Sequence, residues 1–144
     1  MTKKIIALQG VSNVGKSETI KNAYELLRAK YLNATILIEE IYKVDITVIL
    51  IIKNVKIGIE SQGDPNGRLV RESLARFVRQ TCQIIICDTR KYGQTVDAVN
   101  KLRQKHEYEV VWLQQGKAEP SAQHASNLEM AKRIIREVEE IINA

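Results

Sequence analysis

A glycine-flanked run near the amino terminus combines residue types that together hold phosphate groups and a divalent cation in proteins. Glycines stand at positions 10 and 15, and a lysine and a serine follow at 16 and 17. Gly15 lets backbone approach an anion where a Cβ would intrude. Lys16 supplies positive charge, and the Ser17 hydroxyl is suited to Mg²⁺. The predicted phosphate-binding residues are Gly10, Val11, Ser12, Asn13, Val14, Gly15, Lys16, Ser17 and Glu18.

The residues on either side predict a strand, a loop and a helix in succession. The run 4–8 is apolar, and apolar residues recur at helical spacing within 17–32. A helix that begins at the loop directs its free N–H groups at a bound anion. In this context the pattern G-x-x-x-x-G-K-S resembles that of the P-loop NTPase superfamily. The resemblance implies ATP or GTP as ligand and Mg²⁺ as cofactor.

The resemblance also implies a carboxylate at the end of a buried strand, where it holds Mg²⁺ through water. Glu60 ends a β-rich run and begins an E-x-x-G sequence, where GTPases of the superfamily have D-x-x-G. Asp88 ends the apolar run 84–87 and fits the pattern of a buried strand followed by Asp more closely. We favour Glu60 as the metal-binding carboxylate and keep Asp88 as the alternative, because the glycine-containing loop after Glu60 can respond to a terminal phosphate.

Three side chains are candidates for catalysis. Lys16 neutralises charge on the transferred phosphoryl group, and Gln62 lies where it can orient an attacking water. Arg90 follows a strand that should end at the ligand edge of the sheet, where it can stabilise phosphate charge. The pair Glu39-Glu40 can instead orient an acceptor hydroxyl, although we interpret it as the start of a polar loop.

The base that such a site would bind is less well defined. GTPases recognise guanine through N-K-x-D, and the nearest string, Asn100-Lys101-Leu102-Arg103, lacks the Asp and lies in a predicted helix. ATP is therefore favoured over GTP. We expect a small Mg²⁺-dependent NTPase or nucleotide switch whose loop 61–67 responds to the γ-phosphate. A small-molecule or nucleotide kinase and a non-catalytic nucleotide-binding adaptor with nucleic-acid affinity remain alternatives.

A formal net charge of +5 agrees with phosphate-rich ligands or nucleic acid but does not decide between functions. Four arginines fall within about 140° of one predicted helix, at about 100° per residue. We interpret them as a solvated face with Arg68–Glu72 and Glu72–Arg76 pairs rather than as a nucleic-acid contact. These arginines are Arg68, Arg71, Arg76 and Arg79.

Strands that alternate with helices predict a single α/β domain over residues 1–144. Its expected architecture is a three-layer sandwich around a mostly parallel sheet of about six strands. The runs 45–52 and 55–60, separated by Lys53-Asn54, predict one antiparallel hairpin. A strand is expected at 35–38, closed by Glu39-Glu40. The remaining elements are expected at 68–80, 84–87, 95–105, 109–113 and 122–142.

The same sequence argues against a membrane protein and favours a cytoplasmic one. The longest apolar run, 46–52, is too short to span a bilayer, and no signal-peptide cleavage site follows the amino-terminal apolar run. Cys82 and Cys87 lie too far apart on one strand to bridge, as expected for reduced thiols. Because small P-loop proteins often take an arginine in trans, a homo-oligomer or a protein partner is possible.

Overall fold

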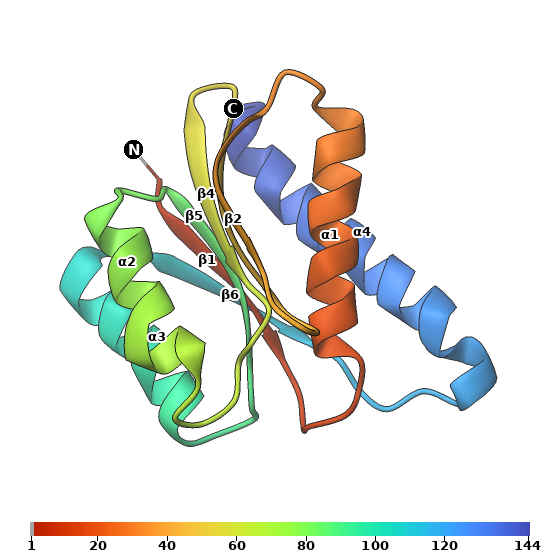
Figure 1. Cartoon of the computed structure of the whole chain (residues 1–144). Helices are drawn as coiled ribbons and strands as arrows, with labels where there is room; N and C mark the ends of the chain where they lie inside the picture. Colours follow the sequence, from red (N-terminus) through yellow and green to blue (C-terminus); the bar gives the residue numbers. More distant parts are fainter. Residues whose placement is uncertain (1) are drawn as a thin grey trace.

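Six strands and four α-helices lie within residues 2–144, the part of the chain that this computed structural model describes. The predicted α/β class and the mostly parallel six-stranded sheet are confirmed (Figure 1). The strands are β1 (Lys4–Gln9), β2 (Thr35–Ile41), β3 (Ile46–Ile52), β4 (Val55–Glu60), β5 (Ile84–Thr89) and β6 (Glu109–Gln114). The helices are α1 (Lys16–Lys30), α2 (Leu74–Arg79), α3 (Gln94–His106) and α4 (Gln123–Ile142).

The strands lie in the order β2-β3-β4-β5-β1-β6. Among these six, only β3 runs against its neighbours, and it pairs antiparallel with both β2 and β4. The predicted hairpin is therefore present. Its turn residues Lys53 and Asn54 both have positive φ, 49° and 67°, as a two-residue turn between twisted strands requires. The other five strands all end at one edge of the sheet.

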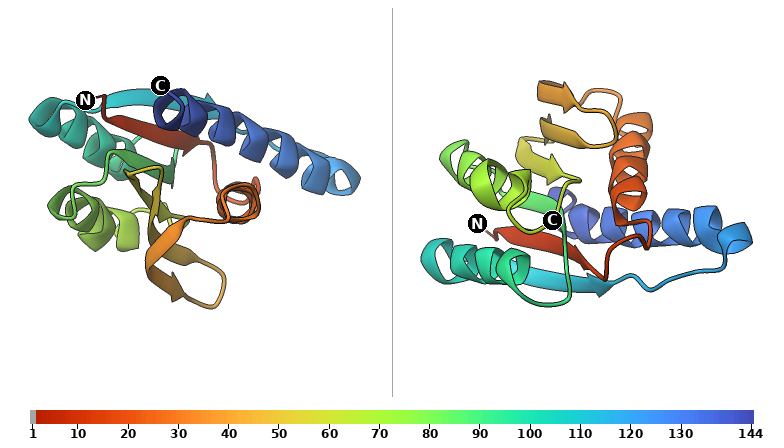
Figure 2. Two further views of the ribbon diagram at one scale, coloured as in Figure 1. Left: turned by 90° about the horizontal axis from the view of Figure 1, so that it is seen from above. Right: turned by 60° about the horizontal axis from the view of Figure 1, so that its bottom comes forward.

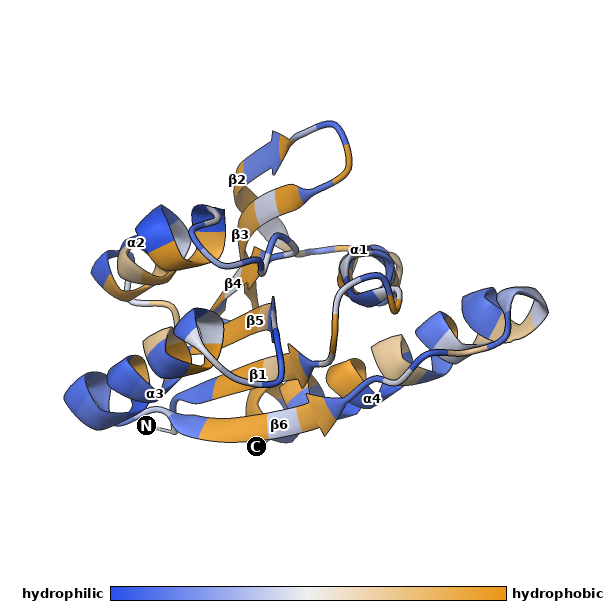
Figure 3. Cartoon of the chain, turned by 90° about the horizontal axis from the view of Figure 1, so that it is seen from below, coloured by the Kyte–Doolittle hydropathy of each residue, from blue (hydrophilic) through white to orange (hydrophobic). Residues whose placement is uncertain are grey.

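The sheet is covered on both faces, with α1 and α4 on one side and α2 and α3 on the other (Figure 1). The central strands β1 and β5 are buried along their whole length, apart from the partly exposed Gln9, as expected for parallel strands between two helical layers. Apolar residues gather on the strands and on the inner faces of the helices, and the outer helix faces are polar (Figure 3). Within residues 2–144, no helix is both long and apolar enough to cross a membrane.

One predicted boundary is wrong, and one predicted helix begins in a different form. Glu39 and Glu40 do not close β2 but lie within it, because the β3 ladder continues to Ile41. The helix expected at 68–80 begins as a π-helical turn, Leu69–Ser73, and becomes α-helical only at Leu74. A wider first turn brings Ser73 within hydrogen-bond distance of the end of β4, a constraint that the 3.6-residue periodicity cannot reveal.

Candidate functional site

A pocket lies at the carboxyl ends of β1 and β5, which pair in parallel. After β1 the chain crosses through α1 to β2 at one edge of the sheet, and after β5 it crosses through α3 to β6 at the other edge (Figure 2). Such a reversal opens a crevice, and open α/β sheets bind ligands there. The pocket has a volume of about 540 Å³ and is lined by Ser12, Asn13, Gly15, Lys16, Ser17, Glu18, Asp64, Asp88 and Arg90.

The glycine loop between β1 and α1 adopts backbone conformations that its sequence permits. Gly15 has a φ of 90°, and Asn13, a residue that tolerates the left-handed region, has a φ of 62°. A Cβ on Gly15 would also lie 2.6 Å from Asn127 Oδ1. No described side chain caps the first turn of α1, which begins at Lys16. The loop therefore turns a helix N-terminus, with its partial positive charge, toward the pocket.

Lys16 is buried at the base of the pocket. Its ammonium group donates hydrogen bonds to the carbonyl oxygens of Gly10, 2.5 Å away, and Thr89, 2.6 Å away. Burial lowers the pKa of Lys16, and the negative charge of Asp88 acts in the opposite direction. Lys16 thus bridges the ends of β1 and β5 and places a cation where an anion would enter.

Asp88, the last-but-one residue of β5, faces the same pocket and is only 4% exposed. Its Oδ1 atom is buried and has no hydrogen-bond partner within residues 2–144. Burial raises the pKa of Asp88 well above its ordinary value of 3.8, while Lys16 pulls it down. An ionisable oxygen that is buried without a partner is costly, and in native proteins it often indicates a functional role.

Glu60, the other predicted carboxylate, is completely buried at the end of β4 and does not line the pocket. Its Oε1 accepts hydrogen bonds from Thr47 Oγ1 and Ser73 Oγ, both at 2.6 Å, and from Arg68 Nε at 3.1 Å. Its Oε2 accepts from the Gln62 backbone N–H at 3.0 Å and Arg68 Nη2 at 3.2 Å. Glu60 therefore organises the segment that follows β4, and its oxygens are occupied by protein donors.

Ser17 contacts the loop 61–67, to which Gln62 belongs. The Ser17 hydroxyl lines the pocket and donates to the Ser61 carbonyl oxygen at 2.9 Å. Gln62 does not line the pocket. Its side chain accepts from the Arg68 backbone N–H at 2.9 Å and donates to Asp64 at 3.3 Å. In this arrangement the Gln62 side chain connects Asp64 to Arg68 across the loop, and its predicted role in orienting a water stays a prediction.

Arg90 enters the pocket from the loop after β5 and meets Asp64, a residue that the sequence analysis did not single out. Arg90 Nη2 lies 2.9 Å from Asp64 Oδ1, and Arg90 Nε is buried without a partner among the described residues. Gly63 allows this meeting, because a Cβ there would lie 2.0 Å from the Asp88 carbonyl oxygen. The loop therefore passes directly over the end of β5.

A cluster of amide side chains supports the glycine loop from behind, and the sequence analysis missed it. Gln115 Nε2 donates to the Val14 carbonyl oxygen at 2.7 Å and to Asn127 Oδ1 at 2.8 Å. Gln123 donates to the same two acceptors, and Asn127 donates to Glu18 at 3.1 Å. The one feature of the sequence that could have indicated this cluster is Asn127, a polar residue on the apolar arc of α4. In the structure Asn127 is completely buried.

Both glutamates of β2 lie outside the pocket and have basic partners. Arg76 makes two hydrogen bonds to Glu40, at 2.9 and 3.1 Å, and lowers the pKa of that carboxyl. Glu39 accepts from the Tyr24 hydroxyl and lies 3.3 Å from Arg28. The expected pairs Arg68–Glu72 and Glu72–Arg76 are therefore wrong. Arg68 pairs with Glu60 and Arg76 with Glu40, because the sheet offers partners that helix periodicity does not indicate.

The structure thus brings most of the predicted phosphate-loop residues to one pocket with Asp88 and Arg90, and leaves Glu60 and Gln62 outside it. No family model, curated relative or solved structure matches this chain.

Proposed function

We propose that this protein binds a nucleoside triphosphate with Mg²⁺ and hydrolyses its terminal phosphate bond. The observation that carries the proposal is that Asp88, which lines the pocket with Lys16 and Ser17, has a buried Oδ1 without a hydrogen-bond partner among residues 2–144. A phosphate cradle alone would need only the loop and its lysine. A carboxylate oxygen kept free of protein donors beside them supports a metal ion as the third component.

The residues of the pocket fit Mg²⁺. This ion prefers oxygen ligands and keeps several waters, so one or two protein oxygens together with phosphate oxygens complete its shell. Asp88 and Ser17 would hold it, directly or through water. We assign the metal-binding carboxylate to Asp88, because the Glu60 oxygens already accept five hydrogen bonds from the protein. Mg²⁺ would supply charge neutralisation on the β- and γ-phosphates.

Each side chain then has a defined role. Lys16 exchanges its two carbonyl acceptors for phosphate oxygens, which carry full negative charge and are the stronger partners. The first turn of α1 donates N–H groups to the same anion. Arg90 leaves Asp64 to stabilise charge on the transferred group. Gln62 acts as a positioning residue, through the loop that carries Asp64.

The position of the only N-K string supports ATP over GTP as the first nucleotide to test. Asn100 and Lys101 lie within α3, and Lys101 lines a different groove, between α2 and α3. Neither residue lines the pocket that holds Lys16. The kinase alternative loses support because the two glutamates of β2 proposed to face an acceptor are paired with Arg28 of α1 and Arg76 of α2.

A thermal-shift titration with ATP, GTP, ADP and GDP, each with and without Mg²⁺, tests the proposal. A ligand that binds only the folded state adds about 2.7 kcal/mol of stability at a hundredfold excess over its Kd. We expect a Mg²⁺-dependent shift with a triphosphate and release of inorganic phosphate without an added acceptor. Lys16→Ala should abolish both. Lys91→Ala, an exposed lysine that does not line the pocket, is the matched control and should retain both.

Other outcomes would replace the proposal. Turnover that requires a hydroxyl or phosphate acceptor would identify a kinase. Binding without turnover, with affinity for DNA that falls steeply with salt, would identify an adaptor. A Lys16→Ala protein that binds nucleotide as well as the parent would refute the site altogether.

A further inference from the structure

A second hollow, larger than the nucleotide pocket, lies between α2 and α3 on the opposite face of the sheet from α1 and α4. Its volume is about 770 Å³, within the range of sites for small organic ligands. The floor is apolar and comes from both helices and from the π-helical turn before α2. The apolar lining residues are Val70, Leu74, Ala75, Val78, Ala98 and Leu102.

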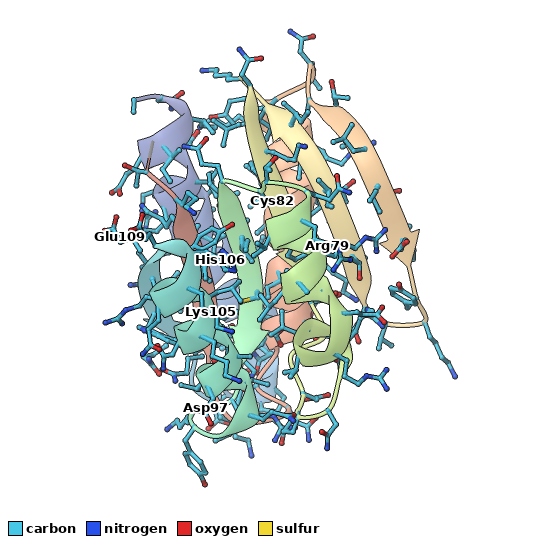
Figure 4. All side chains as sticks on the ribbon, turned by 90° about the vertical axis from the view of Figure 1, so that its left-hand side faces the viewer. Arg79, Cys82, Asp97, Lys105, His106 and Glu109 are labelled. Carbon is cyan, nitrogen blue, oxygen red and sulfur yellow. The ribbon has the colours of Figure 1, made fainter. Side chains whose placement is uncertain are left out.

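The charges around this groove are unevenly distributed. Figure 4 shows Arg79, Lys105 and His106 toward one end and Asp97 toward the other. Lys101 lies one helical turn before Lys105 on the same wall. None of Arg79, Lys101 and Lys105 has an ion-pair partner within residues 2–144. The groove therefore combines a long apolar floor with cations concentrated at one end.

A smaller hollow of about 290 Å³ adjoins the basic end and shares Val78 and His106 with the groove. Lys3 belongs to it, with its ammonium group 4.8 Å from the centre of the Tyr108 ring. The negative end of a helix dipole stabilises cations near the helix C-terminus, which accounts for basic residues near the ends of α2 and α3. The dipole does not account for their convergence on one apolar groove together with a lysine from the chain's amino-terminal segment.

We propose that the groove between α2 and α3 binds a small amphiphilic carboxylate, with its acyl chain along the apolar floor and its carboxylate at Arg79 and Lys105. The length agrees with such a ligand. Gln94 and His106 bound the groove along α3. They are twelve residues apart, which at about 1.5 Å per residue is about 18 Å. A medium-length acyl chain fills that distance, and a single anionic group matches the single basic end.

Isothermal titration calorimetry with sodium dodecanoate, below its micelle concentration, tests the site on the full chain without nucleotide. We expect saturable binding of one dodecanoate. Arg79→Glu/Lys105→Glu reverses two exposed charges and should weaken binding about tenfold or more, since two exposed pairs are lost and two repulsions gained. Lys43→Glu/Lys117→Glu makes the same change in net charge outside the groove and should bind like the parent.

Two further measurements locate the ligand and define what the groove recognises. Amide chemical shifts on titration should move at Ala98 and Leu102, and not at Ala29 and Ile135, which line the apolar hollow between α1 and α4. Dodecanol should bind more weakly than dodecanoate, and acetate should not bind. The proposal would be overturned if dodecanol bound as tightly as dodecanoate, or if dodecanoate did not bind saturably. It would also be overturned if the control variant lost as much affinity as Arg79→Glu/Lys105→Glu, or if the chemical shifts moved only in α1 and α4. Binding of an acidic amphipathic peptide that dodecanoate fails to displace would overturn it as well.

Discussion

Glu60 and Asp88 are carboxylates near the ends of neighbouring parallel strands, and the protein treats them in opposite ways. Glu60 ends β4 and is in register with Cys87, the residue before Asp88 in β5, so the two side chains point to opposite faces of the sheet. Both are buried. Glu60 accepts five hydrogen bonds, two of them from Arg68, whereas Asp88 Oδ1 accepts none from residues 2–144.

The difference separates a structural acid from a candidate site acid. A buried carboxylate is tolerable when charge and donors surround it, and Glu60 meets that condition through residues of β3, the π-helical turn and the loop after β4. Asp88 is stabilised mainly by the nearby charge of Lys16, which offsets its burial only in part, and its pKa stays raised. Its Oδ1 has no hydrogen-bond partner among residues 2–144, which lowers the stability of the fold. Under the proposed function, a bound cation would be its partner. Substitutions of the two residues should therefore affect different properties.

The largest effect should come from Asp88→Asn. This change removes the charge of Asp88, the pocket residue whose buried Oδ1 has no partner among residues 2–144. It should abolish the Mg²⁺ dependence of nucleotide binding and slow phosphate release by about a hundredfold or more. Phosphate release at saturating Mg²⁺ and a thermal-shift titration measure the two effects. Glu60→Gln is the matched variant and should keep the Mg²⁺ requirement. If Glu60→Gln loses that requirement and Asp88→Asn retains it, the assignment of the two acids is reversed.

Glu60→Gln should instead affect stability. Neutralising one member of a buried ion pair leaves Arg68 without its counter-charge, and such changes cost about 3–5 kcal/mol. Arg68 also stacks on the Tyr42 ring, with its guanidinium carbon 3.6 Å from the ring centre, so the loss should spread to the β2–β3 connection. Urea unfolding curves would measure it. A midpoint unchanged from the parent would show that the Glu60 cluster contributes little to folding.

The sequence was sufficient for the elements and for the loop because both depend on local patterns. The apolar strand at 4–8, the glycines of the loop and the helix that follows are adjacent in the chain, so their geometry is encoded locally. The hairpin was also predictable, because only Lys53 and Asn54 separate two β-rich runs. Both residues adopt positive φ in the two-residue turn. These predictions did not require knowledge of the tertiary contacts.

The choice between the two acids was not predictable, because their partners lie outside the strands that carry them and meet them only in the folded chain. Glu60 is saturated by Thr47, Ser73 and Arg68, which come from three separate segments and meet only when β3 pairs with β4 and the π-helical turn follows. The amide cluster behind the loop has the same origin, since Gln115 and Asn127 lie about a hundred residues beyond Val14 and Glu18. A sequence motif indicates neither arrangement.

The smallest expected effect is a pH-dependent gain in stability for Asp88→Asn, measured without Mg²⁺ or nucleotide. Burial raises the pKa of Asp88 above its ordinary value of 3.8, so the folded state holds that proton to higher pH than the unfolded chain does. Stability linked to the proton is present below pH 3.8 and is lost as pH rises through the folded-state pKa. The amide that replaces the carboxyl in the variant does not titrate.

The difference in Tm between Asp88→Asn and the parent should therefore be smallest near pH 4 and grow by a few degrees toward neutral pH, as about 1 kcal/mol corresponds to about 3 °C at this chain length. Asp97→Asn, which changes an exposed carboxylate on α3, is the control and should show no comparable rise. A difference that stays flat with pH would mean that the Asp88 carboxylate is already satisfied in the folded chain, and the contrast with Glu60 would disappear.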